Sequence, residues 1–78
     1  MPRRQKPEPE KLDYRAIGRR IREIRGFEMN QAEFGQLLDV GQSQVSKYER
    51  GEILPPLEVL VRIAAAGGKR LEWIVWGR

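Results

Sequence analysis

The chain of 78 residues contains no cysteine and no histidine. Without cysteine it can form neither a disulfide nor a thiolate zinc site, and without histidine it lacks imidazole ligands and the commonest general base. The sequence also shows no glycine-rich loop of the kind that cradles phosphate. We therefore predict that the protein is not an enzyme and that it holds neither a metal ion nor another cofactor.

Long apolar runs are missing as well. The longest continuous apolar runs are four residues, such as Ile63–Ala66, whereas a membrane-spanning helix needs about 20. The first fifteen residues are charged and rich in proline, and they contain no apolar segment of the kind found in a secretory signal. We expect no membrane partner and a cytoplasmic protein that lies with the nucleoid.

Positive charge is distributed unevenly along the chain, whose formal net charge is +4. Residues 15–25 contain five arginines against one glutamate. Residues 40–51 contain only one acid, Glu49, and carry Lys47 and Arg50 among mostly neutral polar residues. Cationic regions that flank a neutral polar segment suit a nucleic acid, because phosphate contacts supply affinity and base contacts supply specificity.

Residues 1–11 differ in composition from the rest of the chain. They contain three prolines and no apolar residue after Met1, so they cannot bury enough surface to order themselves. We predict a flexible basic arm over residues 1–11 and a single domain over residues 12–78. Arg3 and Arg4 of the arm are candidate contacts to a DNA backbone, and a plain disordered leader is the alternative.

The first predicted helix covers about residues 13–25. Ile17, Ile21 and Ile24 recur at helical spacing and form one buried side. Asp13 is the candidate N-cap of this helix.

A second helix is predicted to begin after Asn30, where Glu33 completes a capping box. Gly35 costs this helix up to about 1 kcal/mol relative to alanine, so we expect another helix to approach closely there. Asp39 is expected to adopt the left-handed conformation in the following turn, where Val40 supplies an apolar plug.

The third predicted helix, about residues 42–50, has two different sides. Val45 and Tyr48 lie one turn apart on the apolar side. The polar side carries Gln42, Ser43, Ser46, Lys47 and Arg50. A glutamine amide presents a donor beside an acceptor, which matches the N6 and N7 edge of adenine. We interpret this segment as a helix that packs through one side and reads base pairs with the other.

Two further helices are predicted after Gly51. The first begins at Pro55 and Pro56, and its expected buried side is Leu57, Leu60, Ile63 and Ala64. The second, about residues 70–76, is apolar on nearly all sides and too short to bury every side chain in its own domain. We predict that Trp73, Ile74 and Trp76 form a self-association patch, and a tryptophan lying flat on the surface is the alternative.

Together these segments resemble the helix-turn-helix of the phage repressor and Cro-type family, also called the xenobiotic-response-element family. The motifs are NQAEF…LL.V at 30–40, GQSQVS at 41–46, YERG at 48–51 and LEWI at 71–74, and the resemblance covers about residues 14–77. It implies an all-α fold: a compact five-helix bundle of the lambda-repressor-like type. It also implies a dimer that binds operator DNA, with the third helix in the major groove.

The polar side of the third helix and the resemblance together assign the site residues. The expected base contacts are Gln42, Ser43, Ser46 and Lys47. The expected backbone contacts are Asn30, Gln31, Arg19 and Arg50, together with Arg3 and Arg4. The resemblance implies a buried salt bridge between Arg25 and Glu49. It also implies that Gln31 bonds a phosphate with one end of its amide and orients the amide of Gln42 with the other.

The predicted function is a sequence-specific DNA-binding transcriptional regulator, a repressor, that reads an inverted-repeat operator in double-stranded DNA as a homodimer. The alternative is an antitoxin-like or coactivator-like helical adaptor that uses the same fold for protein contact. The scarcity of acids in residues 40–51 favours DNA. No small-molecule ligand is evident, and the chain is expected to be either complete or the first domain of a longer protein.

Overall fold

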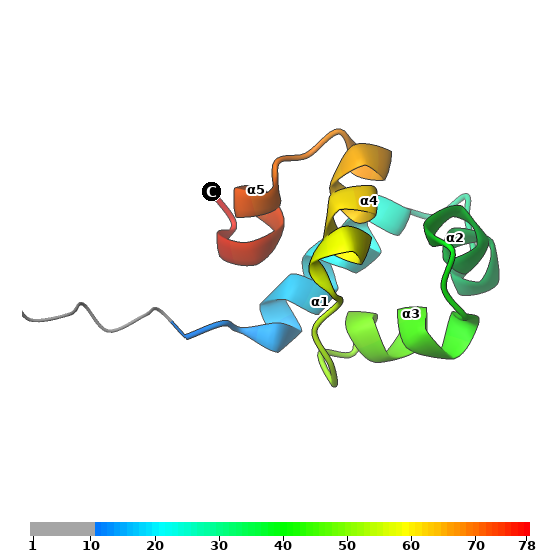
Figure 1. The fold of residues 1–78 in the computed structure, drawn as a ribbon, viewed down its shortest axis with the longest axis horizontal. Coiled ribbons are helices and arrows are strands. Elements are labelled where there is room, and N and C mark those ends of the chain that lie inside the picture. The colour runs from blue at the N-terminus through cyan, green and yellow to red at the C-terminus, as the bar shows by residue number, and fades with distance from the viewer. Residues whose placement is uncertain (1–10) are drawn as a thin grey trace, which may run out of the picture.

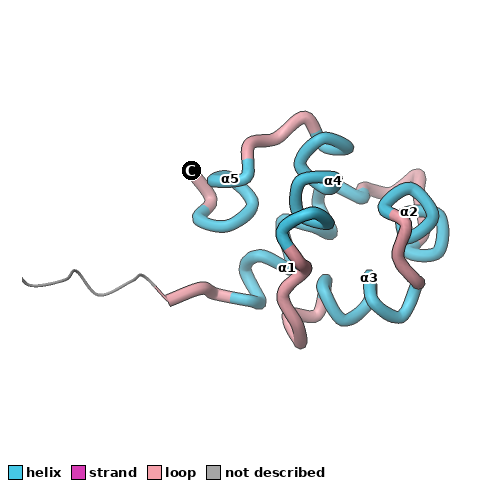
Figure 2. Tube along the Cα trace, in the orientation of Figure 1, coloured by secondary structure: helices cyan, strands magenta, loops and turns pink. Residues whose placement is uncertain are grey.

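The computed structural model describes residues 11–78, and the predictions for Arg3, Arg4 and the rest of residues 1–10 lie outside the described residues. The described part contains five helices, which are α1 (Tyr14–Arg25), α2 (Gln31–Leu38), α3 (Gln42–Glu49), α4 (Leu57–Gly67) and α5 (Leu71–Trp76) (Figure 1). It contains no strand (Figure 2). The predicted all-α class and the number of helices are therefore confirmed.

Helix α1 connects the two ends of the molecule. It packs against α3, α4 and α5, while α2 packs against α3 and α4. Figure 1 shows α5 at the left of the molecule and the α2–α3 pair at the right. The orientation of α3 relative to α5 therefore depends on how each of them sits on α1.

All five helices contribute to one core. The largest fully buried side chains are Phe34, Ile17, Ile21, Leu38, Ile63, Ile74 and Val45. Burying a large apolar side chain stabilises a fold by about 1.5–3 kcal/mol, so this cluster supplies most of the driving force. None of the helices within residues 11–78 has the length and apolar character needed to cross a membrane.

The predicted helix caps are present. The side chain of Asp13 accepts a hydrogen bond from the backbone N–H of Ala16 at 3.1 Å. Asn30 and Glu33 form the full capping box, with reciprocal bonds of 2.8 and 2.9 Å. Asp39 ends α2 in the left-handed conformation, with φ 60°. These caps define the entry to α2 and the turn that leads to α3.

The close approach expected at Gly35 is present, and it is made by the turn into α3 and by the first residue of that helix, Gln42. A Cβ atom at Gly35 would lie 2.7 Å from the carbonyl oxygen of Val40. A second close approach between helices occurs at Gly18 of α1, a position that the sequence did not single out. A Cβ atom there would lie 2.5 Å from the carbonyl oxygen of Glu49.

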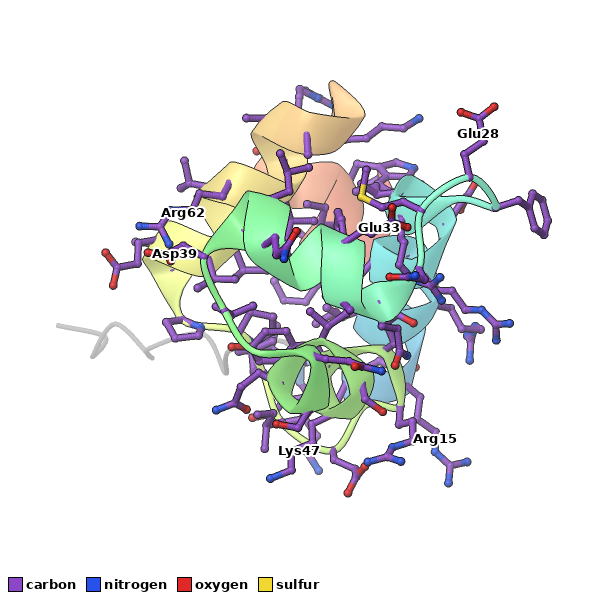
Figure 3. The ribbon with its side chains drawn as sticks, turned by 90° about the vertical axis from the view of Figure 1, so that its right-hand side faces the viewer. Arg15, Glu28, Glu33, Asp39, Lys47 and Arg62 are labelled. Carbon is purple, nitrogen blue, oxygen red and sulfur yellow. The ribbon has the colours of Figure 1, made fainter. Side chains whose placement is uncertain are left out.

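The predicted buried side of α4 is wrong at its first residue. Leu57 is 69% exposed, and Val59 is buried in its place. Pro56 is the N-cap and not part of the first turn, so Leu57 begins the helix at the edge of its buried side. Arg62 of α4 donates a hydrogen bond to the carbonyl oxygen of Leu38 at 3.1 Å and so caps the end of α2 (Figure 3).

The expected patch on α5 requires a correction at Ile74. This side chain is 0% exposed and belongs to the core, because α5 packs on both α1 and α4. Ile74 therefore offers no surface to a second molecule. Trp73 and Trp76 are each half-buried, and the ammonium group of Lys69 lies 4.6 Å from the centre of the Trp73 ring.

Candidate nucleic-acid interface

Helix α3 lies at the edge of the molecule and presents a polar side to solvent. Val45 and Tyr48 are buried beneath it, and burial raises the pKa of the Tyr48 hydroxyl. Of the residues predicted for this side, Ser46 is half-buried. The other four are exposed: Gln42, Ser43, Lys47 and Arg50. The helix is thus held through one side and leaves the other free for a ligand.

Two further residues, Gln44 and Arg15, were not among the contacts assigned from the sequence. Gln44 of α3 is exposed. Its amide is the second one in the GQSQVS motif, and this was the sequence feature that could have indicated it. Arg15 of α1 lies beside the end of α3, because a Cβ atom on Gly51, just after α3, would lie 2.8 Å from the Cα of Arg15. Figure 3 shows Arg15 and Lys47 on the same side of the molecule.

The ion pair expected between Arg25 and Glu49 is present. The Nε of Arg25 lies 2.6 Å from one carboxylate oxygen of Glu49, and a second guanidinium nitrogen lies 2.9 Å from the other. The exposed fractions of the side chains are 15% and 4%. Arg25 also donates a bond of 3.0 Å to the carbonyl oxygen of Met29. The pair therefore joins the end of α1 to the end of α3 and to the loop before α2.

Hydrogen bonding to Glu49 raises the pKa of Arg25, an effect that outweighs the opposing effect of burial. The arginine is therefore charged at any pH at which the protein is handled. Two parallel N–H···O bonds between a guanidinium and a carboxylate also restrict the angle between the groups. The Arg25–Glu49 pair therefore helps to fix the orientation of α3 relative to α1.

Gln31, at the first position of α2, points to this ion pair and not to Gln42. Its Nε2 donates a hydrogen bond of 3.1 Å to Glu49, and no hydrogen bond joins Gln31 to Gln42 in the described part of the chain. A buried carboxylate is a stronger hydrogen-bond acceptor than a neutral amide. The amide of Gln31 therefore donates to Glu49 and not to the side chain of Gln42. The expectation that Gln31 orients Gln42 is wrong for this structure.

The expected backbone contacts lie at three places around α3. Asn30 is exposed at the start of α2, and its side-chain oxygen is already bonded to the backbone of Glu33. Arg50 is exposed at the end of α3 and pairs with Glu52 at 2.5 Å. Arg19 is exposed on α1 and lines a surface depression that it shares with Phe27. An exposed pair such as Arg50–Glu52 is weak, so a phosphate could replace Glu52.

Comparison with known proteins identifies the same architecture elsewhere. A family model described as helix-turn-helix matches residues 19–74. The crystal structure of the P22 c2 repressor in complex with a synthetic operator is similar to this chain, with 28% identity and a TM-score of 0.74, over 80% of this chain and 96% of that one. The solution structure of the DNA-binding domain of the same repressor has 27% identity and a TM-score of 0.68, over 80% and 83% of the two chains.

A third similar structure belongs to a different kind of regulator. The restriction-modification controller protein C.AhdI from Aeromonas hydrophila has 24% identity and a TM-score of 0.68, over 78% of this chain and 94% of that one. At this identity the likeness shows the fold alone. No curated protein matches the chain.

Proposed function

The chain belongs to the helix-turn-helix family and has the fold of the phage repressors, and on this premise we propose that it is a sequence-specific DNA-binding transcription regulator. The observation that carries the proposal is the exposed, nearly acid-free side of α3. The opposite side of this helix is packed into the core through Val45 and Tyr48. The operator-bound state of the similar P22 c2 repressor supports it. The role is one of binding and not of catalysis, and it is exercised in the cytoplasm with the nucleoid.

Base recognition is assigned to α3 in the major groove, which admits a single helix. Gln42 and Ser43 stand in the first turn and reach base edges first. Lys47 follows one turn later and suits a guanine or a backbone oxygen, while half-buried Ser46 makes at most a short contact. Gln44 is added to the predicted set because its side chain is exposed on the same helix.

Phosphate contacts are assigned to the residues that surround α3. Asn30 and Gln31 stand at the start of α2, where free backbone N–H groups and the helix dipole favour an anion. Gln31 donates one amide hydrogen to Glu49, and its second is left for a phosphate. Arg15, Arg19 and Arg50 add positive charge on either side, and these contacts act without sequence preference.

Self-association is assigned to the exposed parts of α5. Trp73 and Trp76 are half-buried in the single chain, so each retains apolar surface that a second copy could cover. Leu57 and Val61 of α4 are 69% and 49% exposed and add apolar surface on the helix that supports α5. A symmetric dimer that reads both halves of its site spaces them about 34 Å apart, roughly 10 bp from centre to centre.

Selection of bound sites from a random DNA pool tests the proposal. We expect the parent to enrich one inverted repeat, because two copies of α3 would read equivalent half-sites. Gln42→Ala should lose about 1–3 kcal/mol of preference at one base pair of each half-site. Gln36→Ala is the matched control, since it removes the same amide from an exposed position of α2 outside the assigned contacts. Enrichment of no sequence by the parent would support the adaptor alternative.

A further inference from the structure

Helix α5 depends on its neighbours for its stability and its position. It contains six residues, fewer than an isolated helix needs to be stable in water. Its N-cap, Arg70, makes no side-chain capping bond. The position of α5 therefore depends on its contacts with α1 and α4.

Arg20 of α1 makes the polar contact that anchors α5. One guanidinium nitrogen donates hydrogen bonds of 2.9 Å to the carbonyl oxygen of Ile74 and 3.2 Å to that of Val75. The last carbonyl groups of a helix have no partner within the helix, and a cation is favourable near them. Arg20 thus satisfies two acceptors that α5 itself leaves open.

Gly77 makes room for this contact. It ends α5 in the left-handed conformation, with φ 80°, and its N–H donates to the carbonyl oxygen of Trp73 at 2.8 Å. A Cβ atom at this position would lie 2.7 Å from a guanidinium nitrogen of Arg20. A residue with a side chain would both strain the backbone and push the guanidinium away.

The two arginines Arg20 and Arg25 tie α1 to the two functional ends of the molecule. Arg25 binds Glu49 at the end of α3, and Arg20 binds the end of α5. They stand five residues apart on one helix, which corresponds to about 7.5 Å along its axis. The distance and angle between α3 and α5 are consequently set through a single rigid element.

We propose that Arg20 is a positioning residue that fixes α5 relative to α3 and thereby determines which half-site spacing the dimer selects. The inference rests on the proposed function, in which α5 carries the dimer contact. In this role Arg20 contacts no DNA and recognises no base. Its effect is to make one spacing between the two copies of α3 much better than its neighbours.

The test compares Arg20→Met, which keeps the length of the side chain without its donors, with Arg20→Lys, which keeps a donor and the charge. Arg22→Met is the matched control, because Arg22 is exposed on the same helix and outside the assigned contacts. Gly77→Ala disturbs the same contact from its other side. Because this change is made at the edge of α5, outside the core, it remains informative if Arg20→Met fails to fold.

Two measurements are made on each variant. Both tryptophans of the chain lie in α5, so quenching of their fluorescence by acrylamide reports on α5 alone. Binding is then measured to inverted repeats whose half-site spacing varies around about 10 bp. We expect Arg20→Met and Gly77→Ala to expose the tryptophans and to lose about tenfold in discrimination between spacings, the effect of one charge-assisted hydrogen bond. Half-site sequence preference should not change, and Arg20→Lys should keep most of the parent's discrimination.

The parent alone tests the proposed function, and the variants test the role of Arg20. If the parent selects no inverted repeat, the proposed dimer is wrong and the spacing role with it. If the parent selects one spacing and both Arg20→Met and Gly77→Ala select it equally strictly, the role of Arg20 is overturned while the proposed function stands. Greater exposure of the tryptophans without a change in spacing would likewise overturn it.

Discussion

Glu49 has the least exposed carboxylate of the ion pairs in residues 11–78. Its side chain is 4% exposed and binds both Arg25 and Gln31. Glu52, three residues later, is 51% exposed and pairs with Arg50, itself 61% exposed. The two pairs have similar chemistry and opposite environments, so they separate the contribution of burial from that of charge.

Replacing Glu49 with alanine should destabilise the protein by about 3–5 kcal/mol, because Arg25 would be left without its partner in a largely buried position. Urea unfolding followed by circular dichroism measures this free energy. Glu52→Ala is the control, and loss of an exposed pair should cost well under about 1 kcal/mol. A Glu49→Ala protein that unfolds at the same urea concentration as the parent would contradict the structural role given to the pair.

At the scale of the helices, α1 and α3 are in direct contact through their backbones. Gly18 faces the carbonyl oxygens of Tyr48 and Glu49, and a Cβ atom there would lie 2.6 and 2.5 Å from them. These atoms belong to the main chain at the end of α3 and cannot move without the helix. The absence of a side chain at Gly18 is therefore what lets the Arg25–Glu49 pair close.

Gly18→Ala should destabilise the protein by about 2 kcal/mol, since overpacking costs up to about 3 kcal/mol and alanine returns about 1 kcal/mol through its helix preference. Gly41→Ala is the control, because a Cβ atom at Gly41 meets nothing within 4 Å. Gly41 is the N-cap of α3, where alanine is less favourable than glycine, so the effect of this change on the urea midpoint should be smaller than that of Gly18→Ala but not zero. Equal effects of the two changes would mean that α1 can separate from α3 at little cost.

In the proposed function, the two ends of the molecule have separate tasks. The α2–α3 pair carries the proposed reading surface, and α5 lies at the opposite end (Figure 1). A change at α5 should therefore alter assembly without altering the preferred half-site. The reverse holds for a change in the exposed side of α3.

Trp76→Asp should convert the proposed dimer to a monomer, because a charge would be buried against the apolar surface of the second copy. Sedimentation equilibrium measures the change, and cooperative binding to the inverted repeat should be lost with it. Leu37→Asp is the control, since Leu37 is 57% exposed on α2, a helix that does not pack on α5. If the Trp76→Asp protein is as dimeric as the parent, the interface lies elsewhere, and the exposed side of α4 becomes the next candidate.

Features that depend on residues a few positions apart could be predicted without the structure. The N-cap at Asp13, the capping box of Asn30 and Glu33 and the left-handed turn at Asp39 all rest on local hydrogen bonds and backbone preferences. The two-sided character of α3 followed in the same way, because helical spacing alone separates Val45 and Tyr48 from the polar residues. These local features were enough to predict five helices and the polar side of α3, which is the proposed DNA-reading surface.

The partners of those residues, in contrast, depend on how distant segments fold together. Gln31 binds Glu49, 18 positions away, and Arg20 binds Ile74, 54 positions away. Ile74 was assigned to the self-association patch because the helix is apolar on nearly all sides and short, yet this residue is fully buried because α5 packs on two helices at once. Burial and hydrogen-bond partners depend on how distant segments pack, and a periodic pattern within one helix specifies a side but not what covers it.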